Sequence, residues 1–254
     1  MSTKTRNETS IKANINLSIY GDPLTVSVDV PTGKTLPRKM LPVFRKVCGS
    51  IVEASVRHAE NAGRTVSCAA GCGACCRQMV TISPAEAIQL KRLVDTLPED
   101  RRAIIAERFE KAKVAMSEAE LLDTLRSEEK PVGPAYKTLG LAYFEMKVAC
   151  PFLENESCSI HPERPLVCRE YLVVSAPENC SRENGQSIEV IKIPREASKA
   201  LTSIDGPKEF TNWIPLTLAL EWAEEHPETE VPRPGTEIAA EFFDHLTDRY
   251  SLPN

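Results

Sequence analysis

The sequence lacks any apolar run long enough to cross a membrane. Its longest weakly charged stretch, residues 210–220, is far shorter than the roughly 20 residues that a transmembrane helix needs, and Pro215 interrupts it. The first 22 residues also lack an apolar core followed by a small-residue cleavage site, so we find no secretory signal. We therefore expect a cytoplasmic protein without a membrane span.

An excess of basic residues is also missing. The chain carries 31 Lys and Arg against 36 Asp and Glu, for a net charge of −5, so the charge balance offers no support for nucleic-acid binding. We find no glycine-rich phosphate loop, no GxSxG nucleophile motif, no HExxH motif and no internal repeat. These absences leave no recognisable nucleotide-binding, serine hydrolase or zinc protease pattern, and we expect no nucleic-acid partner.

Cysteine, in contrast, is abundant. The chain has 254 residues, of which 42% are hydrophobic and 26% charged, which is enough to bury a core without covalent cross-links. Its nine cysteines are therefore more naturally metal ligands or redox groups than structural disulfides in a reducing compartment. The odd number also leaves at least one thiol unpaired.

The N-terminal third shows two different hydrophobic periods. Apolar residues alternate with polar ones from Ile15 to Val30 around the turn Tyr20-Gly21-Asp22-Pro23, which predicts a β-hairpin. From Pro37 the spacing becomes helical and continues to Asn61, before Gly63. Cys48 falls within this helix, where we expect a small buried apolar thiol.

The rest of the chain is predicted to be mainly helical. Ser83-Pro84-Ala85-Glu86 is a capping box that starts a helix running to about Thr96. A charged helical region from Pro98 to Arg126 follows, then a short helix or strand over 136–146 and a strand over 187–193. Two or three amphipathic helices are expected around 197–204, 214–225 and 237–248. The expected apolar stripe of the charged region consists of Ile104, Ile105, Phe109, Val114, Leu121, Leu122 and Leu125.

These elements predict a mainly α fold with a small β component (α+β). We expect residues 1–13 to be a flexible N-terminus and residues 14–254 to form a single domain. That domain contains a cysteine-cluster metal-binding region at 66–180 and a helical C-terminal part at 195–250. Two cysteine-rich loops, joined by a metal site, are expected beside the N-terminal hairpin.

Eight of the nine cysteines fall into two groups on either side of the long helices. Gly71 and Gly73 allow the first loop to curl so that several thiolates converge, because glycine adopts a positive φ without strain. The second group is spaced too widely to chelate on one turn, so it would complete sites begun by the first. The candidate metal ligands are Cys68, Cys72, Cys75, Cys76, Cys150, Cys158, Cys168 and Cys180.

All-sulfur ligation favours zinc or an iron–sulfur cluster over magnesium or calcium. Only Cys72 and Cys75 have the Cys-x2-Cys spacing typical of zinc ribbons, which favours iron–sulfur, most simply a [4Fe–4S] cluster, with zinc as the alternative. The count allows two four-thiolate sites or one such site with spare cysteines. Because adjacent Cys75 and Cys76 are hard to place on one small ion, one of them could serve a second site or redox chemistry; a vicinal disulfide is the other interpretation.

Other residues near the cysteines have two interpretations each. His161 lies three residues after Cys158 but begins a Pro-rich turn, where capping or packing is expected more than metal ligation. Arg77, Arg164 and Arg169 adjoin cysteines and would offset thiolate charge or form ordinary ion pairs. Cys68-x3-Cys72-x2-Cys75 also has the spacing of the radical S-adenosylmethionine motif, although Ala74 stands where that motif usually has an aromatic residue.

Two separated blocks of sequence resemble the YkgJ-type cysteine-cluster family (CxxCxxCC), described as a zinc- or iron-chelating domain. They are Gly71-Cys72-Gly73-Ala74-Cys75-Cys76-Arg77 before the capping box, and Cys150-Pro151-Phe152-Leu153 with Cys158-Ser159-Ile160-His161, Arg164-Pro165 and Cys168-Arg169. The resemblance covers about residues 66–180 and implies metal or cluster binding, without implying a reaction. A related domain in flagellin lysine methylases uses S-adenosylmethionine and is associated with an iron–sulfur cluster.

The leading functional hypothesis is a metal-binding protein that holds an iron–sulfur cluster or iron and has a redox or regulatory role. An iron–sulfur oxidoreductase is the enzyme class that this hypothesis allows, and the expected partner is an unknown protein or redox partner. One alternative is a structural zinc module for protein interaction. Another is an S-adenosylmethionine-dependent methyltransferase-like or radical enzyme.

Overall fold

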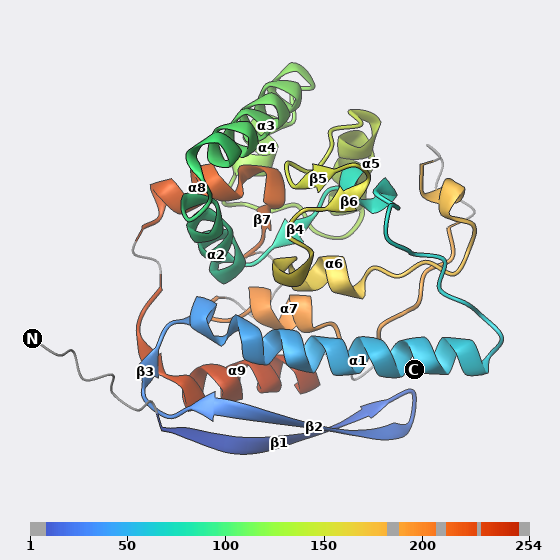
Figure 1. Ribbon diagram of the computed structural model, residues 1–254, viewed down its shortest axis with the longest axis vertical. Coiled ribbons are helices and arrows are strands. Elements are labelled where there is room, and N and C mark those ends of the chain that lie inside the picture. Colours follow the sequence, from blue (N-terminus) through green and yellow to red (C-terminus); the bar gives the residue numbers. More distant parts are fainter. Residues whose placement is uncertain (1–8, 182–187, 207–211, 228–229, 249–254) are drawn as a thin grey trace, which may run out of the picture.

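The computed structural model describes residues 9–181, 188–206, 212–227 and 230–248 (Figure 1). Helices account for 54% of the described residues and strands for 15%, which confirms a mainly α fold with a small β component. Two layers are visible in Figure 1: a hairpin with three helices at one end of the molecule, and a group of helices at the other. The cysteine-rich loops lie beside the second group.

The N-terminal hairpin is confirmed and is longer than expected. Strands β1 (Ser10–Ile19) and β2 (Asp22–Pro31) pair antiparallel, and their turn places Tyr20 and Gly21 at positive φ. Residues 10–13, expected to be flexible, continue the ladder and pair with 28–31, because backbone pairing extends beyond the part of the strand that has an apolar face. The remaining part of the expected flexible terminus, residues 1–8, lies outside the described residues.

Two helices cover the apolar face of this hairpin, and a third packs on those two. After the short η1 (Pro37–Met40), α1 (Leu41–Asn61) packs on β2, and α7 (Ala197–Thr202) and α9 (Gly235–Asp248) complete the layer. Phe44 of α1 stacks on Phe242 of α9 with ring centroids 4.1 Å apart, and both side chains are fully buried. Cys48 is also fully buried here, as expected. Strands β3 (Lys34–Thr35) and β8 (Arg233–Pro234) pair at the edge of this layer.

The second layer contains α2 (Pro84–Asp95), α3 (Glu99–Glu118), α4 (Leu122–Arg126), α5 (Gly133–Glu145) and α8 (Ala219–Glu225). The two-residue strands β4 (Thr81–Ile82) and β7 (Ile214–Pro215) pair antiparallel, and η5 (Leu216–Leu218) leads from β7 into α8. The expected stripe of α3 is partly wrong, because Ile104 and Val114 are 40% and 54% exposed. The buried face of α3 instead carries Ile105, Phe109 and, unforeseen, Met116. Helix α5 begins at Gly133, three residues before the short helix or strand expected over 136–146.

Short elements between the layers carry the cysteines. These are η2 (Ala74–Arg77), β5 (Leu153–Glu154), β6 (Ser157–Cys158), η3 (His161–Glu163), α6 (Leu166–Glu170) and η4 (Pro177–Ser181). Within the described residues, the strand expected over 187–193 is reduced to a single bridge between Val173 and Val190, with no longer run of paired residues on either side of it. Residue 187 lies outside the described residues. In the described part of the chain, no helix has the length and apolar character needed to span a bilayer.

Candidate metal centre

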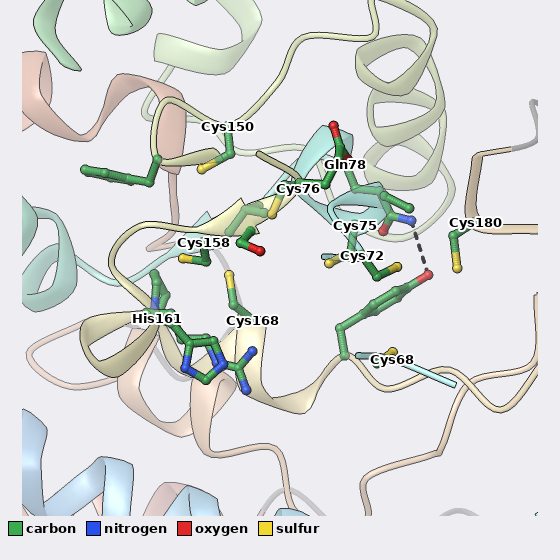
Figure 2. Close-up of a pocket in the computed structure, with 18 of the residues that line it drawn as sticks. Cys68, Cys72, Cys75, Cys76, Gln78, Cys150, Cys158, His161, Cys168 and Cys180 are labelled. Atoms are coloured by element: carbon green, nitrogen blue, oxygen red, sulfur yellow. Dashed lines mark hydrogen bonds between the residues drawn. The ribbon is translucent and has the colours of Figure 1, made fainter. Parts of the chain in front are cut away.

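A cavity of about 540 Å³ opens between these short elements, and all eight candidate cysteines line it (Figure 2). Cys48, the ninth, lies on α1 and is buried in the hydrophobic core that α1 shares with the hairpin. All nine are free thiols. The fold thus brings together two cysteine groups that are separated in the sequence by α2 to α5.

The first cysteine group depends on two glycines. Gly71 has a φ of +88°, a conformation that side chains rarely adopt, and this turn leads into η2. Gly73 packs so closely against the β5–β6 hairpin that an added Cβ would lie 3.2 Å from the Cα of Glu156 and 2.7 Å from the Cδ1 of Leu153. The first loop can therefore approach the second because residue 73 has no side chain.

Backbone hydrogen bonds fix the second group against the first. The Cys150 N–H donates to the Cys76 carbonyl at 2.7 Å, which places the two residues side by side. Cys158 is then returned toward Cys150 by the β5–β6 hairpin, in which Cys158 pairs with Leu153. The tight turn of this hairpin holds Asn155 and Glu156 at positive φ. Together these contacts bring Cys150 and Cys158 to one end of the cavity.

Glu86 positions Cys168 by holding the start of α6, the helix that carries this cysteine. The expected capping box is present: the Ser83 side chain accepts from the Glu86 N–H, and the Glu86 carboxylate accepts from the Ser83 N–H. The second Glu86 oxygen accepts from the Leu166 N–H at 2.8 Å, at the start of α6. One buried carboxylate therefore caps α2 and also holds the helix that carries Cys168.

Cys68 and Cys180 reach the opposite side of the cavity through a different set of contacts. Ser67 donates its N–H to the Val173 carbonyl at 2.9 Å, and the Val173 N–H donates to the Cys68 sulfur at 3.3 Å. Helix η4, which carries Cys180, packs on η2. The stretch from Val173 to Cys180 thus folds back over the first loop.

The thiols differ in how readily they ionise. Burial raises the pKa of Cys150 to about 12 and holds the pKa of Cys168 well above its ordinary value. At the centre, a hydrogen bond from Cys76 lowers the pKa of Cys75 to about 6, and the same bond raises the pKa of Cys76. A cation entering the cavity would replace the protons of the high-pKa thiols, since metals bind the thiolate form.

The basic residues near the cysteines have separate roles. Arg77 forms a two-pronged pair with Glu156 at 2.9 and 2.7 Å, and Arg169 donates to the carbonyls of Pro162 and Arg164. Neither makes a sulfur contact in the described hydrogen bonds. Arg164 lines the cavity, and its Nε–H is buried without a hydrogen-bond partner among the described residues. That orphaned donor suits an acceptor in the cavity, such as a sulfide or thiolate.

His161 also lines the cavity, at the start of η3, where Arg164 lowers the pKa of the imidazole. Two further lining residues were not anticipated from the sequence. The Gln78 amide donates to the Tyr171 hydroxyl at 3.2 Å, beside the first cysteine loop (Figure 2). Tyr171 lies three residues after Cys168, and a tyrosine so close to a candidate ligand is the signal that could have indicated it.

The donor set fits a thiolate-bound centre, but the thiols are spread around the cavity. Within the described ranges, no group of three or more His, Cys, Asp or Glu side chains is gathered as a ready site for a single metal ion. A tetrahedral zinc site needs all four sulfurs about 2.3 Å from the metal. The side chains present therefore suit zinc or iron by chemistry, while their spacing suits a larger group than one ion.

A family comparison agrees with this chemistry. Residues 67–190 match the family model CxxCxxCC, described as "Putative zinc- or iron-chelating domain". The matched segment spans 124 of the 254 residues. It contains all eight cavity cysteines and excludes Cys48. Comparison with curated proteins and with solved structures finds no significant match to the chain.

Gly73→Ala is expected to destabilise the CxxCxxCC segment by about 1–3 kcal/mol, the usual cost of overpacking. The new methyl group must displace Glu156 and Leu153, which loosens the Arg77–Glu156 pair and moves the β5–β6 hairpin. Denaturant unfolding and metal content measure the effect. Gly49→Ala is the matched control, because nothing lies within 4 Å of its Cβ position and it sits inside α1. Equal stability of the two variants would contradict this role of Gly73.

Glu86→Gln is expected to cost about 1–3 kcal/mol, because the amide has one acceptor where the carboxylate has two, and a buried N–H of Ser83 or Leu166 loses its partner. Thermal unfolding of the variant checks the effect. Glu110→Gln, on the exposed face of α3, is the control and is expected to leave the melting temperature unchanged. If both variants melt with the wild type, Glu86 does not hold α6 in the CxxCxxCC segment.

Proposed function

We propose that this protein holds an iron–sulfur cluster, most simply [4Fe–4S], and uses it in a redox or regulatory role. The observation that carries the proposal is the single cavity of about 540 Å³ lined by eight free cysteines, none of which was drawn into a disulfide. The match to the zinc- or iron-chelating family model supports metal binding in general. The assignment of iron and sulfide goes beyond that and rests on the cavity.

The spacing of the thiols supports a cluster over a single ion. A mononuclear four-thiolate site would draw its sulfurs around one point, whereas the described residues contain no such gathering. In an iron–sulfur cluster, iron and sulfide occupy the space between the cysteine ligands, so the ligands stand farther apart. The buried, unpaired Arg164 Nε–H at the cavity wall could donate a hydrogen bond to a cluster sulfur, a contact that tunes cluster potential.

The surroundings support a centre that exchanges electrons more than one that converts a bound substrate. Outside the cysteines, the lining is mainly apolar, with Met79, Val80, Phe152 and Leu216 among its members. Burial in such surroundings and hydrogen bonds to sulfur are two of the means by which proteins set cluster potentials. We place the protein in a reducing, cytoplasmic setting, where nine free thiols persist.

Anaerobic purification of the full chain, without added metal, tests the proposal. Iron, zinc and acid-labile sulfide are counted per chain, and a visible spectrum is recorded before and after dithionite. We expect a brown protein with matched iron and sulfide whose absorbance is bleached on reduction. Colourless protein with stoichiometric zinc would overturn the cluster assignment and leave a structural zinc module for protein interaction as the function.

A further inference from the structure

The cavity thiols lie in two groups. In Figure 2, Cys76, Cys150, Cys158 and Cys168 surround one end of the cavity, whereas Cys68, Cys72 and Cys180 lie at the other. Cys75 lies between the groups. The ends also differ in construction, since the first is built on the β5–β6 hairpin and α6 and the second on the Ser67–Val173 contact and η4.

Backbone contacts follow the same division. The Cys150 N–H donates to the Cys76 carbonyl at the first end, and the Val173 N–H donates to the Cys68 sulfur at the second, where η4, which carries Cys180, packs on η2. Seven cysteines therefore lie at one end or the other, and Cys75 lies between them.

The conformation of the Cys75-Cys76 pair completes the division. Both residues lie in η2, a 3₁₀ turn in which successive side chains diverge by about 120°. Cys76 is held beside Cys150 by the 2.7 Å backbone hydrogen bond, so it belongs to that end. Four thiols already surround that end, so Cys75, which lies between the groups, is the one left for the three thiols that lack a fourth ligand.

We propose that the cavity holds two metal centres of four thiolates each, an inner centre on Cys76, Cys150, Cys158 and Cys168 and an outer centre on Cys68, Cys72, Cys75 and Cys180. This inference rests on the proposed metal binding and deepens it. Each centre takes an iron–sulfur cluster, because such clusters are held by four cysteine thiolates and fill the space between them. The peptide bond between Cys75 and Cys76 then joins the two centres directly.

The two centres differ in their exposure. Cys68, in the outer set, is exposed, and so is Gly71 in the same loop. The inner set borders a hydrophobic cluster in which Phe152 and Ile160 are buried and against which Cys150 and Cys158 pack. The outer centre is therefore expected to lose metal to a chelator first, since release needs only loop opening.

Metal counting on single variants of the full chain tests the division. Cys150→Ser and Cys158→Ser remove inner ligands, Cys72→Ser and Cys180→Ser remove outer ligands, and Cys48→Ala is a control outside the cavity. Each ligand variant is expected to lose half of the bound metal, and a double variant with one change in each set is expected to lose all of it. A double variant with both changes in one set should lose no more than half.

A second measurement uses the unmodified chain and so does not depend on variants that fold. Metal release to EDTA is followed in time, and two phases of equal amplitude with rates at least tenfold apart are expected. One release phase, with complete loss of metal in any single ligand variant, would overturn the two-centre arrangement while leaving metal binding intact. A purified chain with no bound metal would overturn the proposed function itself, so the two failures are distinguishable.

Discussion

Stripping the metal from the chain is expected to lower its free energy of unfolding by several kcal/mol. A ligand that binds only the folded state stabilises that state, and structural zinc contributes an apparent binding free energy of about 10–16 kcal/mol in small domains. Here the thiols come from separate short segments: η2 meets the second group through one backbone bond to Cys150, the Arg77–Glu156 pair and the packing of η4. Without metal, these loops lose the bonds that would join them.

The loss of stability should be local, and amide hydrogen exchange measures which segments lose protection. Amides around η2, the β5–β6 hairpin and η4 are expected to exchange faster after metal removal. Amides of the hairpin β1–β2 and of α1 should keep their protection, because their core is formed by residues such as Phe44 and Phe242, away from the cavity. Identical exchange and melting curves with and without metal would show that the centre contributes nothing to folding.

Phe152→Ala is expected to cost about 3–5 kcal/mol and to weaken metal retention as well. Phe152 is 1% exposed and meets Phe109 of α3 edge to face, with ring centroids 5.6 Å apart. It lies two residues after Cys150, and its carbonyl accepts from both the N–H and the hydroxyl of Ser159, next to Cys158. Removing the Phe152 ring is therefore expected to loosen the segment that carries Cys150 and Cys158.

Phe242→Ala is the matched control for this prediction. Phe242 is also fully buried and also packs on another phenylalanine, so truncation should cost a similar 3–5 kcal/mol. It belongs to the layer under α1, and metal content per folded chain should stay at the wild-type level. Equal metal retention in the two variants, measured by elemental analysis after equal chelator exposure, would show that Phe152 supports the fold without positioning the cysteines.

The elements with strong local signals could be predicted from the sequence. The capping box at Ser83 and Glu86 depends on residues three positions apart, and it starts α2 as expected. The alternation of β1 and β2 and the helical spacing of α1 are equally local. For the candidate site, the two cysteine groups followed from spacing alone. The positive φ expected at the glycines near Cys72 is found at Gly71, whereas Gly73 has a φ of −94° and is needed for close packing instead.

The remaining features depend on contacts between distant segments. Nothing near Glu86 indicates that its second oxygen caps α6, eighty residues later. The buried face of α3 is set by the helices that pack on it, so the apolar Ile104 and Val114 remain exposed while Met116 is buried. Likewise, the spacing of the cysteines does not decide between one metal site and two, because the proposed division depends on the folded positions of Cys76 and Cys150.

The wide separation of the cysteine groups has a consequence during synthesis. From Cys76 to Cys180 the ribosome adds about 100 residues, which takes about 5–20 seconds at typical elongation rates. During that time the four cysteines of the first group, residues 68 to 76, are already synthesised but lack the second group that would share metal with them. In the proposed two-centre arrangement, metal that binds earlier is held by an incomplete set of ligands, so we expect correct loading only after α6 and η4 have left the ribosome.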